Sequence, residues 1–321
     1  MSKQFVKDLK IGSLVQSYFV VVDIQRISFS APSKRGDYFL KLRLGDISGT
    51  IKAVIWDRSL VSGVIAPDDV LMVTGEVNDY QGPQLIINDY EKIDSSNINR
   101  YLLQPTCPRD SGEMWRQLIT IASELVTDKN LQLLLNSFYD DSELVERFML
   151  APAAKVIHHN YLAGLLEHTL EVVEICRHLC GLYPEYVNKS LLITAAIFHD
   201  IGKIEEYDPH SFTFQQTDKG KLIGHITLGL GILREKIALL PSFPQNTLTE
   251  LEHMIISHHG EKEWGSPEVP KTFNAYTLFH ADLLSARLKQ FTQVMQNYDQ
   301  KNSSWTEWDH YLGRRIFTGF K

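Results

Sequence analysis

Histidine and aspartate residues recur within or at the ends of apolar stretches in the second half of the chain. They are His168 in LLEHT, His199 and Asp200 in FHDIGK, His225 in LIGHI, His258 and His259 in ISHHG, and Asp282 in FHADLL. A charge buried without a partner is costly, so the His199-Asp200 pair calls for a salt bridge, a proton-transfer partner or a metal ion. One such residue is usually a core histidine. Repetition over successive helices instead indicates a bundle whose side chains point at one interior point.

Metal binding is the chemistry that this set of side chains favours. Neutral imidazoles and carboxylates are ligands for manganese, iron, zinc and similar ions. Five histidines and two aspartates exceed the needs of one ion, whereas two ions sharing a carboxylate would use all of them. Two-metal sites activate water and clamp the attacking and leaving oxygens of an in-line displacement. The set therefore indicates hydrolysis of a phosphoester.

Three further residues lie beside these motifs. Lys203 follows His199 by four positions, so both can face one side of a helix, where Lys203 could neutralise a scissile phosphate. The alternative is a solvated lysine at a helix C-terminus. His158 and His159, in IHHNYLAGLLEHT, could touch substrate phosphate or stiffen the ligand shell, and a structural or surface role is the alternative.

The elements that position these residues change character along the chain. The first 95 residues alternate apolar and polar side chains and are rich in β-branched and aromatic types, which predicts strands over 15–30, 37–46, 50–57, 70–77 and 83–93. A short helix or loop is expected over 58–69. Five strands with this interruption are the order of an OB-fold; other small barrels such as SH3-like ones are the alternative.

From residue 111 onward the periodicity is helical. Helices are predicted over 115–126, 131–153, 165–183, 190–203, 221–240, 247–259 and 275–296. The predicted fold is thus multidomain, an all-β OB barrel followed by an all-α bundle. The expected divisions are 1–95 for a nucleic-acid-binding barrel, 96–150 for a linker and helical segment, 151–300 for the metal domain and 301–321 for a tail.

Composition limits the remaining possibilities. A net charge of −7 with 44% hydrophobic and 22% charged residues is typical of a soluble globular protein. No apolar run is long enough to cross a bilayer, and the N-terminus lacks the features of a signal peptide, so we expect a cytoplasmic protein with no membrane association. Three cysteines, an odd number, argue against a disulfide framework.

The barrel offers candidate contacts for a nucleic-acid strand. OB barrels commonly hold single strands through aromatic stacking and a basic groove, and Tyr38, Lys41, Arg43 and Trp56 are the candidates here. Residues 1–95 contain 11 Lys and Arg against 12 Asp and Glu, so the basic residues must cluster in space. A barrel that docks a protein is the alternative.

The order H…HD…H…HH…D resembles the HD-domain superfamily of metal-dependent phosphohydrolases over residues 150–300. The resemblance implies that His168, His199, Asp200 and Asp282 hold one ion. It further implies that Asp200 bridges to a second ion, which is held by His225, His258 and His259. The cyclic-di-GMP branch shares HDIGK, but no GYP follows it in this chain.

An OB-fold joined to such a domain resembles the YhaM-type 3′-5′ exoribonuclease family. The resemblance is carried by HHNYLAGLLEHT, FHDIGK, FTFQQTDKGKLIGHI and ISHHG. It implies two divalent ions, manganese first with iron, zinc, cobalt or magnesium as alternatives, and attack on single-stranded RNA or also single-stranded DNA to give nucleoside 5′-monophosphates. It also implies a homo-oligomer. Asp200, as the shared ligand, and Lys203, from its spacing to His199, are the predicted catalytic residues.

Two other functions stay open on the sequence. One is a small-molecule nucleotide phosphohydrolase or cyclic-nucleotide phosphodiesterase with a regulatory OB domain. The other is a binding or scaffold protein with a degenerate HD domain, against which the intact ligand set argues.

Overall fold

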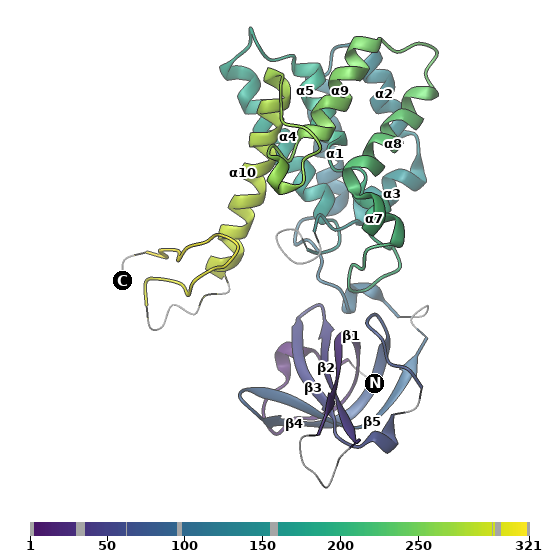
Figure 1. Ribbon diagram of the computed structural model, residues 1–321, viewed down its shortest axis with the longest axis vertical. Coiled ribbons are helices and arrows are strands. Elements are labelled where there is room, and N and C mark those ends of the chain that lie inside the picture. Colours follow the sequence, from purple (N-terminus) through teal and green to yellow (C-terminus); the bar gives the residue numbers. More distant parts are fainter. Residues whose placement is uncertain are drawn as a thin grey trace. The chain divides into compact units, whose positions relative to one another are not determined.

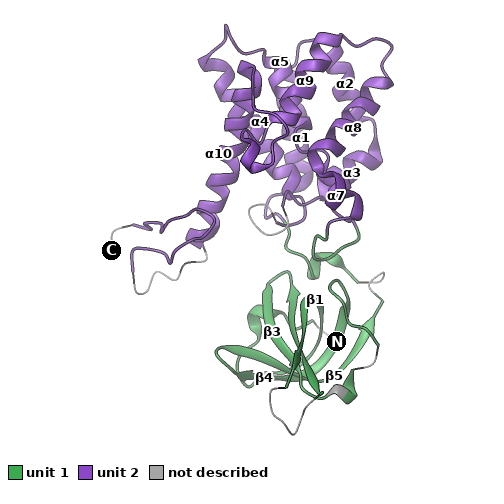
Figure 2. Ribbon diagram, in the orientation of Figure 1, with its two compact units in different colours: residues 1–106, 210–215 green, residues 107–209, 216–321 purple. Residues whose placement is uncertain are grey.

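The computed structural model divides the chain into two compact units (Figure 2). Residues 1–106 together with 210–215 form the first unit, and residues 107–209 with 216–321 form the second. Within these ranges the structure describes residues 3–29, 36–61, 63–94, 98–154, 160–296, 298 and 303–319. His158 and His159 lie outside the described residues, so their predicted roles stay predictions, as do the expected domain ranges.

The first unit is a closed five-stranded barrel (Figure 1). Its strands are β1 (Leu14–Ser28), β2 (Tyr38–Asp46), β3 (Gly49–Ile55), β4 (Val70–Asp79) and β5 (Pro83–Ile93). The barrel closes in the order β1-β2-β3-β5-β4, with β1 paired antiparallel to β4 and β3 parallel to β5. This is the predicted OB-fold. A short 3-10 helix, Arg58–Leu60, lies in the expected interruption after the third strand.

Strand alternation decides which side chains the barrel exposes. In β2, Leu40, Leu42 and Leu44 are buried in the barrel core, whereas Lys41 and Arg43 point outward. Gly75 marks a register shift between β4 and β5, where a Cβ atom would stand 2.1 Å from the carbonyl oxygen of Ile86. A side chain cannot fit there, so glycine is required for the strands to close.

A segment from the second half of the sequence completes the first unit. Residues 210–215 belong to the barrel unit although their chain neighbours on both sides belong to the second. Oδ1 of Asp68 accepts hydrogen bonds from the backbone N–H and the hydroxyl of Thr213, both at 2.7 Å. Nε2 of Gln104 donates to the carbonyl of Ser211 at 3.0 Å. Both Ser211 and Gln104 are buried, so the segment is fixed to the unit.

The second unit is helical. Its helices are α1 (Ser111–Leu125), α2 (Lys129–Tyr139), α3 (Ser142–Leu150), α4 (Gly164–Leu182), α5 (Lys189–Phe198), α6 (Lys203–Glu206), α7 (Asp218–Ile223), α8 (His225–Ala238), α9 (Gln245–Ser257) and α10 (Phe273–Gln296). Every residue of α5 after Lys189 is buried, and α5 packs against α4, α9 and α10. In the described part of the chain, no helix combines the length and apolar character needed to span a membrane.

Three helices that the sequence predicts as continuous are broken, and these predictions are wrong. The stretch 190–203 splits because α5 ends at Phe198 and α6 begins only at Lys203. The stretch 221–240 breaks at Gly224, which has a φ of 77°. The stretch 131–153 is two helices, because Asp141 caps a new one. The first two breaks place metal-ligand candidates at helix ends, where side chains can turn toward a common point.

Candidate metal centre

All seven ligand candidates lie in the second unit and meet in its interior. His168 comes from α4 and Asp282 from α10, while His225 is the first residue of α8. The remaining four follow helix ends. His199 and Asp200 come directly after α5, and His258 and His259 come directly after α9.

The first group of ligand atoms surrounds one oxygen of Asp200. Nε2 of His168 lies 3.3 Å from Nε2 of His199, and the two lie 3.6 and 3.5 Å from Oδ2 of Asp200. Oδ1 of Asp282 lies 3.0 Å from Nε2 of His168 and 3.9 Å from Nε2 of His199. Two nitrogens and two carboxylate oxygens thus converge from three helical segments.

The second group faces the other oxygen of the same carboxylate. Oδ1 of Asp200 lies 3.4 Å from Nε2 of His225 and 3.5 Å from Nε2 of His258. A nitrogen of His259 joins them, because one ligand atom from each of the three histidines falls within 4.8 Å of the others. Asp200 is therefore the residue common to both groups.

Three atoms of the second group are buried without a hydrogen-bond partner among the described residues. They are Oδ1 of Asp200, Nε2 of His225 and Nε2 of His258. Buried polar atoms are nearly always satisfied, so their convergence fits a cation held between them. Imidazole nitrogens with carboxylate oxygens form a donor set suited to first-row transition ions.

The outward nitrogens of the imidazoles fix their tautomers. Nδ1 of His199 faces the carbonyl of Ala196 at 2.7 Å, and Nδ1 of His258 faces the carbonyl of Ile255 at 2.6 Å. A carbonyl only accepts, so both Nδ1 atoms carry the proton and both Nε2 atoms offer a lone pair inward. Such outer partners orient metal-ligating histidines in general.

His168 and His225 are oriented by side chains from other segments. Nδ1 of His168 lies 3.0 Å from the hydroxyl of Ser285, which itself donates to Glu171 at 2.7 Å. Nδ1 of His225 lies 3.3 Å from Oε2 of Glu206. Nothing in the sequence distinguishes Glu206, Glu171 or Ser285, because isolated acidic and hydroxyl residues are common. Only the fold brings Glu206 and Ser285 to the imidazoles and Glu171 to Ser285.

Burial and mutual charge set the protonation of the centre. Burial lowers the pKa of His199 to about 4 and that of His259 to about 3, so both imidazoles are neutral at pH 7. Burial opposes ionisation of Asp200, but Lys203 and the imidazoles outweigh it and hold its pKa well below the usual range. Burial likewise disfavours protonated His258, but the carboxylate of Asp200 outweighs it and raises the His258 pKa.

Lys203 lies inside the centre. Its ammonium is 2.5 Å from Oδ2 of Asp200, and its side chain is only 11% exposed. The broken helix places it at the start of α6, so it pairs with Asp200 rather than lying along a helix with His199. The alternative of a solvated lysine at a helix C-terminus is therefore wrong.

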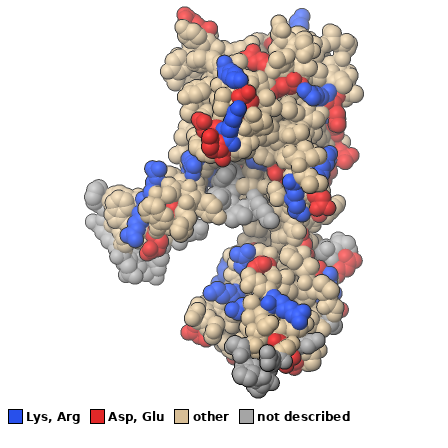
Figure 3. All heavy atoms as spheres, viewed as in Figure 1, with Lys and Arg blue, Asp and Glu red and all other residues tan. Residues whose placement is uncertain are grey.

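Of the residues predicted to contact a nucleic-acid strand, the barrel brings Lys41 and Arg43 together and places Tyr38 apart from them. Lys41 and Arg43 line a groove of about 330 Å³ with Lys52 and Tyr80. Figure 3 shows Lys and Arg side chains gathered on the face of the barrel unit that is in view. Tyr38 instead packs toward the barrel core, with Cζ of Arg26 3.6 Å from its ring centroid. Tyr38 is thus on the opposite side of β2 from Lys41.

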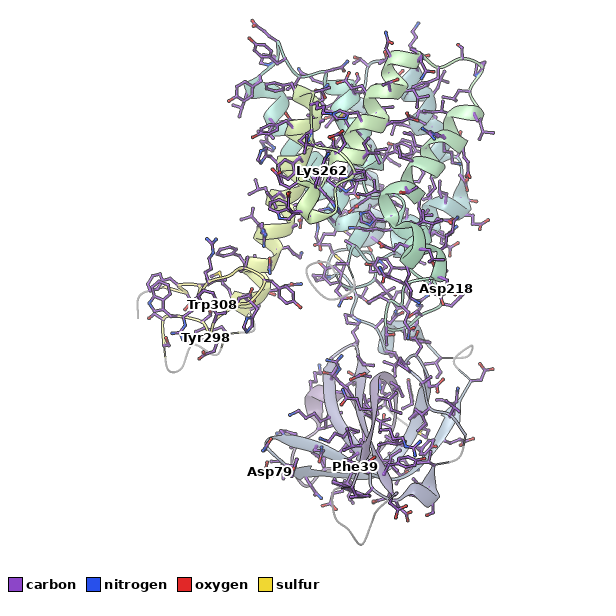
Figure 4. All side chains as sticks on the ribbon, viewed as in Figure 1. Phe39, Asp79, Asp218, Lys262, Tyr298 and Trp308 are labelled. Atoms are coloured by element: carbon purple, nitrogen blue, oxygen red, sulfur yellow. The ribbon has the colours of Figure 1, made fainter. Side chains whose placement is uncertain are left out.

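Trp56 belongs to an aromatic cluster on the barrel. It is 46% exposed, and its ring centroid lies 4.5 Å from that of Phe39, which is labelled in Figure 4. Phe39 lies 5.1 Å from the ring of Phe29 and has Nζ of Lys41 5.9 Å from its centroid. The exposed ring of Trp56 is of the kind on which a base of a single strand can stack.

Known proteins match this chain both within its helical unit and over most of its length. The HD domain model matches residues 165–287. The chain is 30% identical over 312 residues to the 3′-5′ exoribonuclease YhaM of Bacillus subtilis, covering 96% of this chain and 95% of that protein. It is 32% identical over 272 residues to YhaM of Oceanobacillus iheyensis, with 82% of each covered.

Among solved structures, the second OB-fold domain of replication protein A from Methanococcus maripaludis is similar. It is 21% identical, with a TM-score of 0.25, and the match covers 30% of this chain and all of that domain. The identity to the curated relatives extends over nearly their full length. The chain therefore belongs to the YhaM family of 3′-5′ exoribonucleases.

Proposed function

We propose that this chain is a 3′-5′ exoribonuclease that hydrolyses single-stranded RNA to nucleoside 5′-monophosphates with two divalent ions. The observation that carries the proposal is the division of Asp200 between two donor groups, with Oδ2 facing His168 and His199 and Oδ1 facing His225 and His258. Family membership supports the substrate and the direction of attack. Single-stranded DNA is proposed as a second substrate.

The proposed ligand sets follow the two groups. One ion would be held by His168, His199, Asp200 and Asp282, and the other by Asp200, His225, His258 and His259. Manganese is the proposed ion because the family resemblance implies it, and the mixture of imidazole nitrogen and carboxylate oxygen donors is compatible with it as well as with iron, zinc or cobalt. When bound, such a pair of ions supplies an activated water and a clamp for the charge of the transferred phosphate.

Lys203 and Asp200 are the proposed catalytic residues. The Lys203 ammonium pairs with Asp200 within the centre, so it would supply positive charge there when a phosphodiester enters. Asp200 and Asp282 both have pKa values below the usual range, despite burial, because of the surrounding cations and imidazoles. Both carboxylates are therefore ionised at neutral pH and ready to hold ions.

The barrel is the proposed platform for the RNA strand. Lys41 and Arg43 would meet backbone phosphates in the groove, with Lys52 beside them. Trp56 would stack on a base. Tyr38, His159, the cytoplasmic location and the homo-oligomer stay predictions.

The direct test uses RNA labelled at its 5′ end. Incubation of the full chain with Mn²⁺ should yield a ladder of labelled products shortened from the 3′ end, with nucleoside 5′-monophosphates released. The His199→Ala/Asp200→Ala variant should yield no ladder, because it removes ligands of both groups. A wild-type protein that leaves the RNA intact, or a variant that gives the same ladder, would contradict the proposal.

A parallel measurement separates this function from a small-molecule phosphohydrolase. The Lys41→Ala/Arg43→Ala variant should raise the KM for RNA and leave hydrolysis of bis(p-nitrophenyl) phosphate unchanged, since only the long substrate needs the groove. Rapid turnover of cyclic or free nucleotides, with no RNA degradation, would favour the alternative.

A further inference from the structure

Glu206 is a buried carboxylate whose two oxygens are both engaged. Oε2 lies 3.3 Å from Nδ1 of His225, and Oε1 accepts a hydrogen bond from Nε2 of Gln216 at 3.1 Å. The residue is 7% exposed. A carboxylate held at both oxygens has one orientation available, so it can orient whatever it touches.

His225, like His168, is oriented by a side chain from another segment, whereas two other imidazoles of the centre are not. His199 and His258 are fixed by carbonyls three residues earlier in their own helical segments. His225 is the first residue of α8, follows the positive-φ Gly224, and has no earlier helical turn beneath it. Its ring therefore needs a partner from another segment, and α6 supplies Glu206.

The backbone around the pair is packed too closely for either partner to shift. A Cβ atom on Gly220, in α7, would stand 2.4 Å from the carbonyl oxygen of Glu206. A Cβ atom on Gly202 would stand 1.9 Å from the carbonyl oxygen of His225. The N–H of Thr217 also donates to the Glu206 carbonyl at 2.9 Å. The segments that carry the carboxylate and the imidazole thus touch through their main chains.

We propose that Glu206, itself fixed by Gln216, is a positioning residue for His225. The carboxylate accepts a hydrogen bond from Nδ1–H, which keeps the lone pair on Nε2 and aims that nitrogen toward Oδ1 of Asp200. This rests on the proposed function in that His225 must be a metal ligand. Glu206 contributes no ligand atom; it sets how tightly the second group binds its ion.

The test measures, by calorimetry, the binding of Mn²⁺ to the metal-stripped full chain. Wild-type protein should bind two ions. Glu206→Ala should weaken one of the two binding events by about 10- to 100-fold and leave the other unchanged. Glu206→Gln should recover part of the loss, because its amide oxygen can still accept the Nδ1 proton. Gln216→Leu should give a smaller loss at the same event.

Activity and folding supply the controls. With saturating RNA, Glu206→Ala should need a higher Mn²⁺ concentration than wild type to reach half of its maximal rate. The KM for RNA at saturating Mn²⁺ should be unchanged, since RNA contacts are intact. Glu205→Gln is the matched control. Glu205 is the residue next to Glu206, but it pairs with Lys219 and Arg147 outside the centre, so this variant should behave as wild type. Thermal unfolding of each variant confirms that the fold is kept.

Two results would overturn the assignment. One is a folded Glu206→Ala chain that binds both ions as wild type does. The other is an equal loss of both ions in Glu206→Gln. Failure of the proposed function is recognised separately, because then His225→Ala would leave the Mn²⁺ stoichiometry at the wild-type value.

Discussion

At the residue scale, Lys203 has two proposed roles for its single positive charge. It is the counter-ion of Asp200, and in the proposed reaction it also meets the phosphate. Lys203→Ala should lower kcat on RNA about 100-fold, the usual effect of removing one charge-stabilising donor. Mn²⁺ binding should stay as tight or become tighter, because the lysine and an ion compete for Oδ2 of Asp200. Parallel kinetics and calorimetry measure both effects.

Lys221→Ala is the control for that experiment, since Lys221 is exposed and pairs only weakly with Asp218. An unchanged kcat in Lys203→Ala would assign the lysine to charge balance alone.

The residues that converge in the centre could be predicted from the sequence, and the side chains that orient them could not. His168, His225 and Asp282 stand out because such residues recur on successive helices, whereas one alone is usually a core residue. Glu206 and Ser285 have no such signal, because glutamate and serine are common in helices. Their role depends on which segment lies opposite, and packing of distant segments decides that.

At the element scale, one carboxylate ties the helix that carries His225 to the rest of the bundle. Asp141 caps α3 through the N–H of Leu144 at 3.0 Å and binds Nζ of Lys236, in α8, at 2.6 Å. Lys236 is a buried residue, so its ammonium needs this partner. Hydrogen bonds from Lys236, then from Leu144, lower the pKa of Asp141.

The sign of the pH dependence follows from that lowered pKa. The pair stabilises the fold fully above the unfolded-state pKa of 3.8, and the contribution is lost as the pH falls through the lower folded-state value. Asp141→Asn keeps a capping side chain and removes the charge. It should cost about 1 to 2 kcal/mol at pH 7, a figure reduced for the partial exposure of Asp141. The difference from wild type should vanish in acid.

Urea unfolding of both proteins between neutral pH and about pH 3 measures this difference. Asp140→Asn, one residue away and exposed, should match wild type throughout. A difference in the free energy of unfolding between wild type and Asp141→Asn that stays constant at all pH values would mean that the substitution acts through the shape of the side chain rather than through its charge.

The presence of each helix and strand was easier to predict than the residues at which it ends. The strands follow alternation closely, since each strand must bury one face in the barrel. The helices that carry ligands break where the sequence analysis continued them, at 199–202 and at Gly224. Periodicity cannot detect such breaks, because the apolar residues on both sides remain in helical spacing. Gly202 lies in the first break, where its close approach to the carbonyl oxygen of His225 leaves no room for a side chain.

At the scale of the whole molecule, the chain passes from the helical unit to the barrel unit and back between two metal-ligand motifs. Residues 210–215 belong to the barrel unit, and the chain returns at Gln216, which holds Glu206. Asp68 fixes this segment to the rest of the barrel unit through its hydrogen bonds with Thr213. A substrate that needs both units should therefore be sensitive to this anchor, and a substrate that needs only the metal centre should not.

Asp68→Ala tests that difference. It removes two hydrogen bonds, each worth about 1 kcal/mol, which bounds the loss of kcat/KM on RNA at about three- to thirtyfold. Hydrolysis of bis(p-nitrophenyl) phosphate and binding of two Mn²⁺ ions should be unchanged. Asp89→Ala removes an exposed carboxylate of β5 that accepts a hydrogen bond from the adjacent Tyr90 N–H, and it should leave the hydrolysis of both substrates unaffected. Equal losses on both substrates in Asp68→Ala would mean that the segment supports the metal centre itself rather than the joint use of the two units.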